Sequence, residues 1–200
     1  MFLGSHFSPA SGIIIRDVAA AGRSSKSFYD EKLWDKAKAQ YLSSDDYVFI
    51  QFGHNDQKDS HRHTDPSTTY KQYLTLYIKD ARAAGANPVL LTPISRAVWH
   101  KDALEQSLGD YPADMRQSAV QLRVPLIDMN TATAALFSKR GQHFTQNNLF
   151  MFLPAGKYPN YPKGITDKTH LQVARAKQVA ALTTQGIINA NLPIKAYVQR

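Results

Sequence analysis

The sequence contains no cysteine, and this absence excludes several kinds of site. No disulfide, thiol nucleophile or thiolate metal ligand can form without it. The chain also lacks any run of about 18 apolar residues, so we expect no membrane-spanning helix. The 24 Lys and Arg residues outnumber the 16 acidic ones but form no block of five or six, so the sequence does not predict nucleic-acid binding. The net charge of +8 would suit an acidic polysaccharide as a partner.

The 200 residues predict a single domain over 1–200. Short runs rich in apolar and β-branched residues predict four strands, at 13–18, 47–52, 88–94 and 124–129. Apolar residues spaced three and four apart, with stop signals such as Gly85, predict helices at 33–42, 68–84, 111–123, 131–139 and 169–189. The opening MFLGSHF reads as the end of a helix rather than as a signal peptide, and 142–166 is predicted to be irregular. This alternation predicts an α/β fold with one parallel sheet and helices on both faces.

Polar residues follow each predicted strand, and ligands of such sheets bind at the carboxyl ends of the strands. The stretch VFIQFGHNDQK, Val48–Lys58, runs from an apolar strand directly into Gly53, His54, Asn55 and Asp56. The backbone N–H of Gly22 and the side-chain amide of Asn55 are the donor types that stabilise an oxyanion in acyl transfer. Each could instead belong to an ordinary turn.

Asp167 and His170 are three residues apart, on what the pattern predicts to be the turn before the last helix. At that spacing the carboxylate can hydrogen-bond to the imidazole and leave its other nitrogen free to act as a base. A helix cap at Asp167 with a surface histidine is the alternative. Taken with Gly22 and Asn55, the pair predicts an acyl-transfer site.

The stretches AAAGRSSKSF, VFIQFGHNDQK and TDKTH resemble the glycine, asparagine and Asp-x-x-His blocks of the SGNH (GDSL-type) hydrolases. Within that group the chain is similar to the rhamnogalacturonan acetylesterases, and TPISR and GDYPADMRQSA followed by VPLIDM extend the similarity over nearly the whole chain. The resemblance implies a flavodoxin-like three-layer α/β/α fold, no cofactor and no metal. It also implies that the protein hydrolyses acetyl esters of pectic or related carbohydrate and is secreted or periplasmic. It assigns Asp167 and His170 as the catalytic acid–base pair, and Gly22 and Asn55 as oxyanion donors.

The sequence departs from the family in one block. The Gly-Asp-Ser that supplies the nucleophile has no counterpart in these residues, and neither Gly4-Ser5-His6 nor Ser24 and Ser25 stand in its place. We therefore interpret the chain as incomplete at its amino end, without its first strand, and expect it to be inactive without its serine block. Gly22, Asn55 and His170 are expected to face the place of the serine oxygen.

Several residues are predicted to contact the substrate, which the resemblance identifies as an acetylated polysaccharide or oligosaccharide: His54, Arg23, Arg96 and Trp99. Trp99 would stack on a sugar ring, although salt bridging by the arginines and packing by Trp99 are equally open. His61 and His63 lie on a polar loop where solvation is the usual role, so we predict no metal site. Two other functions stay open: a non-catalytic carbohydrate-binding pseudo-enzyme, and a lipid or other ester hydrolase of the same superfamily.

Overall fold

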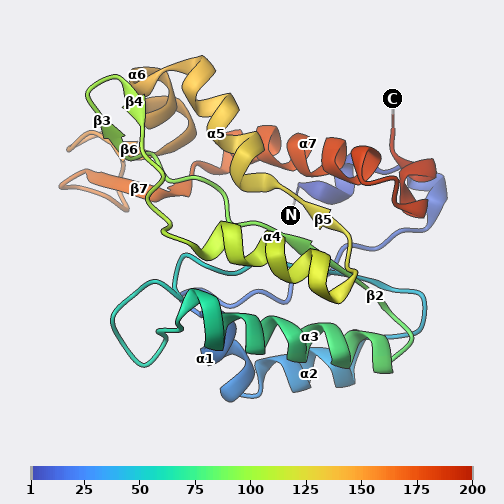
Figure 1. Cartoon of the computed structure of the whole chain (residues 1–200). Coiled ribbons are helices and arrows are strands. Elements are labelled where there is room, and N and C mark those ends of the chain that lie inside the picture. Colours follow the sequence, from blue (N-terminus) through green and yellow to red (C-terminus); the bar gives the residue numbers. More distant parts are fainter. Residues whose placement is uncertain (1, 200) are drawn as a thin grey trace. The chain divides into compact units, whose positions relative to one another are not determined.

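The computed structural model describes residues 2–199, apart from the side chain of residue 174, and the chain divides into two compact units. The first comprises residues 1–15, 94–107 and 129–200, and the second residues 16–93 and 108–128. Figure 1 shows the elements of both. The single domain over 1–200 stays a prediction.

The second unit contains a parallel sheet in the order β1-β2-β5. Its strands are β1 (Tyr47–Ile50), β2 (Asn87–Leu91) and β5 (Leu126–Ile127), and β2 pairs in parallel with both neighbours. Three of the four predicted strands are therefore members of one parallel sheet, as expected. The predicted α/β class with a parallel sheet is confirmed.

Four helices accompany this sheet: α1 (Ser25–Asp30), α2 (Leu33–Tyr41), α3 (Lys71–Ala83) and α4 (Tyr111–Leu122). A single π-helical turn, η3 (Pro66–Tyr70), leads into α3. The apolar side of α3 is fully buried, with Leu74, Tyr77 and Ile78 no more than 2 % exposed. Trp34 and Lys38 of α2 both donate to Asp80 of α3, which fixes these two helices side by side (Figure 1). The apolar residues spaced three and four apart in the sequence therefore predict the buried side of α3 correctly.

The first unit has no parallel sheet among its described residues and consists mainly of α5 (Met129–Arg140) and α7 (Val173–Asn189) with two hairpins. One hairpin pairs β3 (Trp99–His100) with β4 (Ala103–Leu104), and the other pairs β6 (Phe150–Leu153) with β7 (Ile165–Leu171), both antiparallel. Its short elements are α6 (Gln142–Phe144) and the turns η1 (Leu3–His6), η2 (Pro9–Ser11), η4 (Thr145–Leu149) and η5 (Pro193–Tyr197). A small core of Ala97, Phe137, Leu149 and Phe150 joins the segment before β3 to α5, η4 and β6, and Trp99, Leu104 and Leu171 pack against it.

Four sequence predictions about the elements are wrong, and three of them concern residues 13–18, residues 142–166 and the start of the last helix. Residues 13–18 are not a strand: Ile14 is 72 % exposed, and a β-branched run becomes a strand only beside a hydrogen-bonded neighbour. Residues 142–166 are not irregular throughout, because they contain α6, η4, β6 and the start of β7. The last helix begins at Val173 rather than at 169, so Asp167 and His170 lie on β7 and not on a helical turn.

The amino-terminal residues form the short 3₁₀ turn η1 instead of the end of an α-helix, and α1 is a helix that the sequence pattern does not predict. The other helices agree with the sequence to within a few residues at each end, as helix boundaries usually do. Among the described residues no helix combines the length and the apolar character needed to cross a bilayer.

Candidate active site

The loop that follows β1 adopts a conformation that only glycine accepts readily. Gly53 has φ of 136°, and a Cβ placed there would lie 2.8 Å from Cγ of Pro93. Both the dihedral angle and the close contact therefore exclude a larger residue at this position. The glycine turns the chain sharply at the end of the strand, so that Asn55 and Asp56 follow immediately.

The carboxylate of Asp56 joins this loop to the glycine block. Its oxygens accept hydrogen bonds from the backbone N–H of Gly53 at 3.0 Å and of Ser25 at 3.0 Å. The hydroxyls of Ser25 and Thr64 also donate to it. The side chain is completely buried, and this burial raises the pKa of Asp56 even though the hydrogen bonds act in the opposite direction. One buried carboxylate thus fixes two segments that are about thirty residues apart in sequence.

The two proposed oxyanion donors belong to this same unit and lie on adjoining segments. The side-chain amide of Asn55 donates to the carbonyl oxygen of Arg23 at 3.0 Å, one residue beyond Gly22. An asparagine side-chain amide has two N–H groups, and this hydrogen bond uses one of them. Gly22 has φ of 75°, and its carbonyl oxygen accepts a hydrogen bond from Arg62 at 2.9 Å. The structure therefore brings Gly22 and Asn55 to one place.

Two serines of the glycine block are buried and engaged in structural hydrogen bonds. The hydroxyl of Ser24 accepts from the backbone of Ser27, and the Ser27 hydroxyl accepts from the backbone N–H of Ser24, which makes a capping box for α1. Ser25 donates to Asp56. Both Ser24 and Ser25 have 0 % exposed surface, whereas a nucleophile must reach its substrate. These hydrogen bonds are structural, and the interpretation that neither serine replaces the family's nucleophile stays a prediction.

The first unit holds the Asp167–His170 pair on β7. Nδ1 of His170 lies 2.6 Å from Oδ2 of Asp167, which is the hydrogen bond that their spacing predicts. Oδ1 of Asp167 accepts the backbone N–H groups of Thr169 at 2.7 Å and of His170 at 3.0 Å. Since the carboxylate occupies Nδ1, Nε2 is the ring nitrogen that can take a proton from a substrate or nucleophile.

The charge on Asp167 is favoured by its surroundings. Burial by itself would raise the pKa of this carboxyl, but the bonds from the backbone of His170 and Thr169 and from the His170 ring outweigh it, and the pKa is lowered. The His170 side chain is 76 % exposed, while that of Asp167 is 23 % exposed. An ionised carboxylate therefore orients an imidazole that is open to solvent.

The arginines predicted to line a sugar site both have protein partners. Arg23 forms a salt bridge with Glu31 at 2.9 Å and is exposed. Arg96 donates to the carbonyl oxygen of Ser107 at 3.1 Å, and burial lowers the pKa of its guanidinium. Salt bridging and packing, which the sequence left open for these residues, account for these contacts.

Trp99 and His54 lie in different units. Trp99 begins β3 and packs against the small core around Phe137 and Phe150. His54 is half-buried in the loop after β1. The part of the chain that the structure describes contains no group of three or more acidic, histidine or cysteine side chains that could hold a metal ion. A cleft of about 340 Å³ beside Tyr29 and Tyr73 is lined by none of the predicted site residues.

The residue that sequence reasoning missed is Asp56. Its position directly after Gly-His-Asn, at the end of an apolar strand, could have indicated that this aspartate is buried and fixes the loop. Its partner Ser25 lies 31 residues away in sequence, and Thr64 lies in a polar loop without periodicity, so no local pattern indicates either contact.

The sequence matches a known family over most of its length. The sequence model of the GDSL-like lipase/acylhydrolase family matches residues 2–149. The rhamnogalacturonan acetylesterase RhgT of Bacillus subtilis is 38 % identical over 190 residues, covering 94 % of this chain and 80 % of that protein. The probable rhamnogalacturonan acetylesterase YesY of the same organism is 36 % identical over 195 residues, covering 96 % and 84 %.

Solved structures share the fold at lower sequence identity. The crystal structure of the protein YXIM of Bacillus subtilis superposes with a TM-score of 0.77 at 23 % identity, over 96 % of this chain and half of that one. Axe2, an acetylxylan esterase from Geobacillus stearothermophilus, gives a TM-score of 0.60 at 15 % identity, over 94 % and 76 % of the two chains. The predicted fold class, a three-layer α/β fold with a parallel sheet, is confirmed by these likenesses.

Proposed function

The chain belongs to the GDSL-like lipase/acylhydrolase family, a family of carboxylic ester hydrolases, and from this premise we propose that it is the scaffold of a serine-type carbohydrate acetylesterase. The observation that carries the proposal is the 2.6 Å hydrogen bond between His170 and Asp167. An imidazole oriented by a carboxylate in this way is the base that activates a serine hydroxyl for attack on an ester.

In the proposed reaction each residue has a separate role. Nε2 of His170 takes the proton of the attacking hydroxyl and later gives it to the leaving alcohol. Asp167 holds the ring in the tautomer that this transfer requires and stabilises the imidazolium that forms. The backbone N–H of Gly22 and the amide of Asn55 donate to the oxygen on which negative charge develops. Asp56 and Arg62 act on these donors only by fixing their backbone.

The proposed substrate is an acetylated pectic polysaccharide or oligosaccharide. Two relatives that match over most of this chain are named for rhamnogalacturonan, and a structural neighbour is named for acetylxylan. Pectic chains carry carboxylates, and the net charge of +8 favours a polyanionic partner over a neutral one. We therefore place pectic acetyl esters ahead of xylan acetyl esters.

The 200-residue chain is proposed to be inactive alone, because the family's Gly-Asp-Ser nucleophile block has no counterpart in it. The test is acetate release from acetylated rhamnogalacturonan, acetylated xylan and a long-chain lipid ester. It compares the 200-residue chain with a chain extended at its amino end by the family's Gly-Asp-Ser block. The proposal expects turnover only for the extended chain, and fastest on rhamnogalacturonan.

Two other results would replace the proposal. Preference for the lipid ester would assign the chain to lipid ester hydrolysis. Binding of the polysaccharide by both chains without any turnover would make the protein a carbohydrate-binding pseudo-enzyme. In the extended chain, His170→Ala must abolish the activity for the assignment of the base to stand.

A further inference from the structure

The backbone that carries Asp167 and His170 is irregular. In the hairpin of β6 and β7, Phe150 pairs with Leu171, but the next residue, Met151, pairs with Asp167. Residues 168–170 therefore have no pairing partner on β6 and bulge out of the ladder. Bulges of this kind re-aim side chains next to functional sites, and here the bulge sets the direction of His170.

A hydrogen bond from outside the hairpin supports the bulge. The backbone N–H of Ala97 donates at 2.8 Å to the carbonyl oxygen of Lys168, the residue directly after Asp167. Ala97 is completely buried in the small core with Phe137 and Phe150. The hydrogen bond from Ala97 therefore holds the peptide group that joins Lys168 to Thr169, and the N–H of this group is one of the two that Asp167 accepts.

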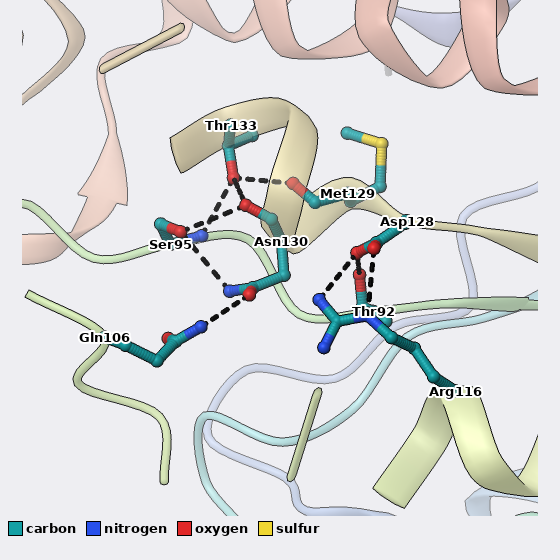
Figure 2. A network of polar contacts seen from close by, with 8 residues as sticks. All are labelled: Thr92, Ser95, Gln106, Arg116, Asp128, Met129, Asn130 and Thr133. Atoms are coloured by element: carbon teal, nitrogen blue, oxygen red, sulfur yellow. Dashed lines mark hydrogen bonds and ion pairs between the residues drawn. The ribbon is translucent and has the colours of Figure 1, made fainter. Parts of the chain in front are cut away.

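Residues 95–97 are in turn fixed by the first turn of α5. Oγ1 of Thr133 accepts the backbone N–H of Ser95 at 2.9 Å and donates at 2.6 Å to the carbonyl oxygen of Met129. The hydroxyl of Ser95 donates to the carbonyl oxygen of Asn130 at 3.2 Å, and the amide of Asn130 lies 3.3 Å from that hydroxyl. Figure 2 shows these groups pointing toward one another, and Ser95, Asn130 and Thr133 are all at most 3 % exposed.

Asn130 also contacts Gln106, which lies beyond the β3–β4 hairpin at the far end of the segment 95–107. Its Oδ1 accepts a hydrogen bond from the amide of Gln106 at 2.6 Å (Figure 2). The guanidinium of Arg96 bonds to the carbonyl oxygen of Ser107 and closes the segment on itself. The β3–β4 hairpin is therefore attached at both ends to one helical turn, which limits how far Ala97 can move.

We infer that Thr133 and Asn130 are positioning residues for the Asp167–His170 pair, acting through Ser95 and Ala97 on the bulge at 168–170. This inference rests on the proposed function for its catalytic meaning. The coupling itself is a property of the folded chain and can be measured without any turnover.

The test uses the 200-residue chain and two variants of matched chemistry. Thr133→Val removes the hydroxyl that accepts from Ser95. Thr145→Val is the control, because Thr145 is equally buried and donates to the carbonyl oxygen of Phe137 but does not contact residues 95–97 in any described hydrogen bond. Ser95→Ala is a milder second variant that loses only the hydroxyl bonds to Asn130.

Two NMR measurements report on the coupling: hydrogen exchange of the Ala97 amide, and titration of the Asp167 carboxyl carbon. In Thr133→Val we expect Ala97 to exchange at least about fivefold faster, since a hydrogen bond of ordinary strength is lost. The pKa of Asp167 should rise toward its ordinary value as the N–H groups of Thr169 and His170 lose their alignment. Ser95→Ala should shift both in the same directions, and Thr145→Val should leave both unchanged.

Unchanged titration of Asp167 in folded Thr133→Val and Ser95→Ala would overturn the inference, as would equal shifts in Thr145→Val. If Thr133→Val does not fold, Ser95→Ala decides in the same way. Failure of the proposed function is a separate result. It would be seen as absent turnover in the extended chain while the Asp167 titration still responds to Thr133.

Discussion

Replacing Asp56 with alanine should lower the free energy of unfolding by about 3 kcal/mol, because it leaves buried donors without an acceptor. The N–H groups of Gly53 and Ser25 lose their partner in a place where the side chain has no exposed surface. Each unsatisfied buried donor costs roughly 1–3 kcal/mol, and removal of a desolvated carboxylate returns part of the sum. The hydroxyls of Ser25 and Thr64 can rotate to other acceptors, so we count only the backbone groups.

Urea unfolding measures this loss as a lower midpoint with an unchanged slope. Asp17→Ala is the control, since Asp17 is exposed and accepts only a local bond from Ala19 in the described structure, and its midpoint should not move. The urea midpoint of Asp56→Asn should lie between those of the parent and of Asp56→Ala. Its carbonyl oxygen can still accept some of the hydrogen bonds, whereas its NH₂ group would face other donors. An Asp56→Ala midpoint equal to that of the parent would refute the role of the carboxylate.

The dependence on pH tests the same carboxylate in a second way. Because the pKa of Asp56 is raised from 3.8 by burial, the folded chain binds more protons than the unfolded chain between 3.8 and the raised value. The stability of the parent relative to Asp56→Asn should therefore fall as pH rises through that interval, and then stay level. A relative stability that instead rises as the pH increases toward 3.8 would show that the hydrogen bonds outweigh burial and that the pKa of Asp56 is lowered.

In the chain extended by the family's nucleophile block, His170→Ala should reduce kcat by several orders of magnitude, as loss of one triad member does. Asn55→Ala should reduce kcat by about 10²–10³-fold with the same esterase assay, and a change confined to KM would make the amide a substrate-binding group instead. Gly53→Ala should destabilise the chain by roughly 1–3 kcal/mol in urea unfolding, because φ is 136° and Pro93 lies too close for a Cβ. Gly12→Ala, where φ is 69° but no atom lies within 4 Å of the added Cβ, should cost less, and equal losses would contradict the steric argument.

The parts of the fold that the sequence predicts well are those in which burial repeats regularly. The buried side of α3 follows from apolar residues three and four apart, and β2 from a run of apolar residues. The hydrogen bond between Asp167 and His170 is predicted from their spacing of three residues, but on β7 it forms because the bulge at 168–170 turns His170 toward the carboxylate. For α3 and β2 a local pattern contains the information that determines the structure.

The predictions that failed depend on partners that a local pattern does not contain. Residues 13–18 have the composition of a strand, but no described strand pairs with them. The strand β7 has alternating exposure, yet the sequence predicts the start of a helix there because Thr169 and His170 precede an apolar helical repeat. The hydrogen bonds of Asp56 to Ser25 and of Ala97 to Lys168 join distant segments and leave no trace in spacing.

Gly22, Asn55 and His170 all lie on irregular backbone, and buried groups hold each of these irregular segments in place. Gly22 and Asn55 lie on turns that Asp56 joins. His170 lies in a bulge that depends on the buried segment at 95–97. Regular elements satisfy their own backbone groups, whereas turns and bulges need acceptors and donors from elsewhere. We therefore expect substitutions at these buried polar groups to change the geometry of the proposed site more than substitutions in the regular helices do. Measuring both the free energy of unfolding and the Asp167 titration separates a change in site geometry from a general loss of stability.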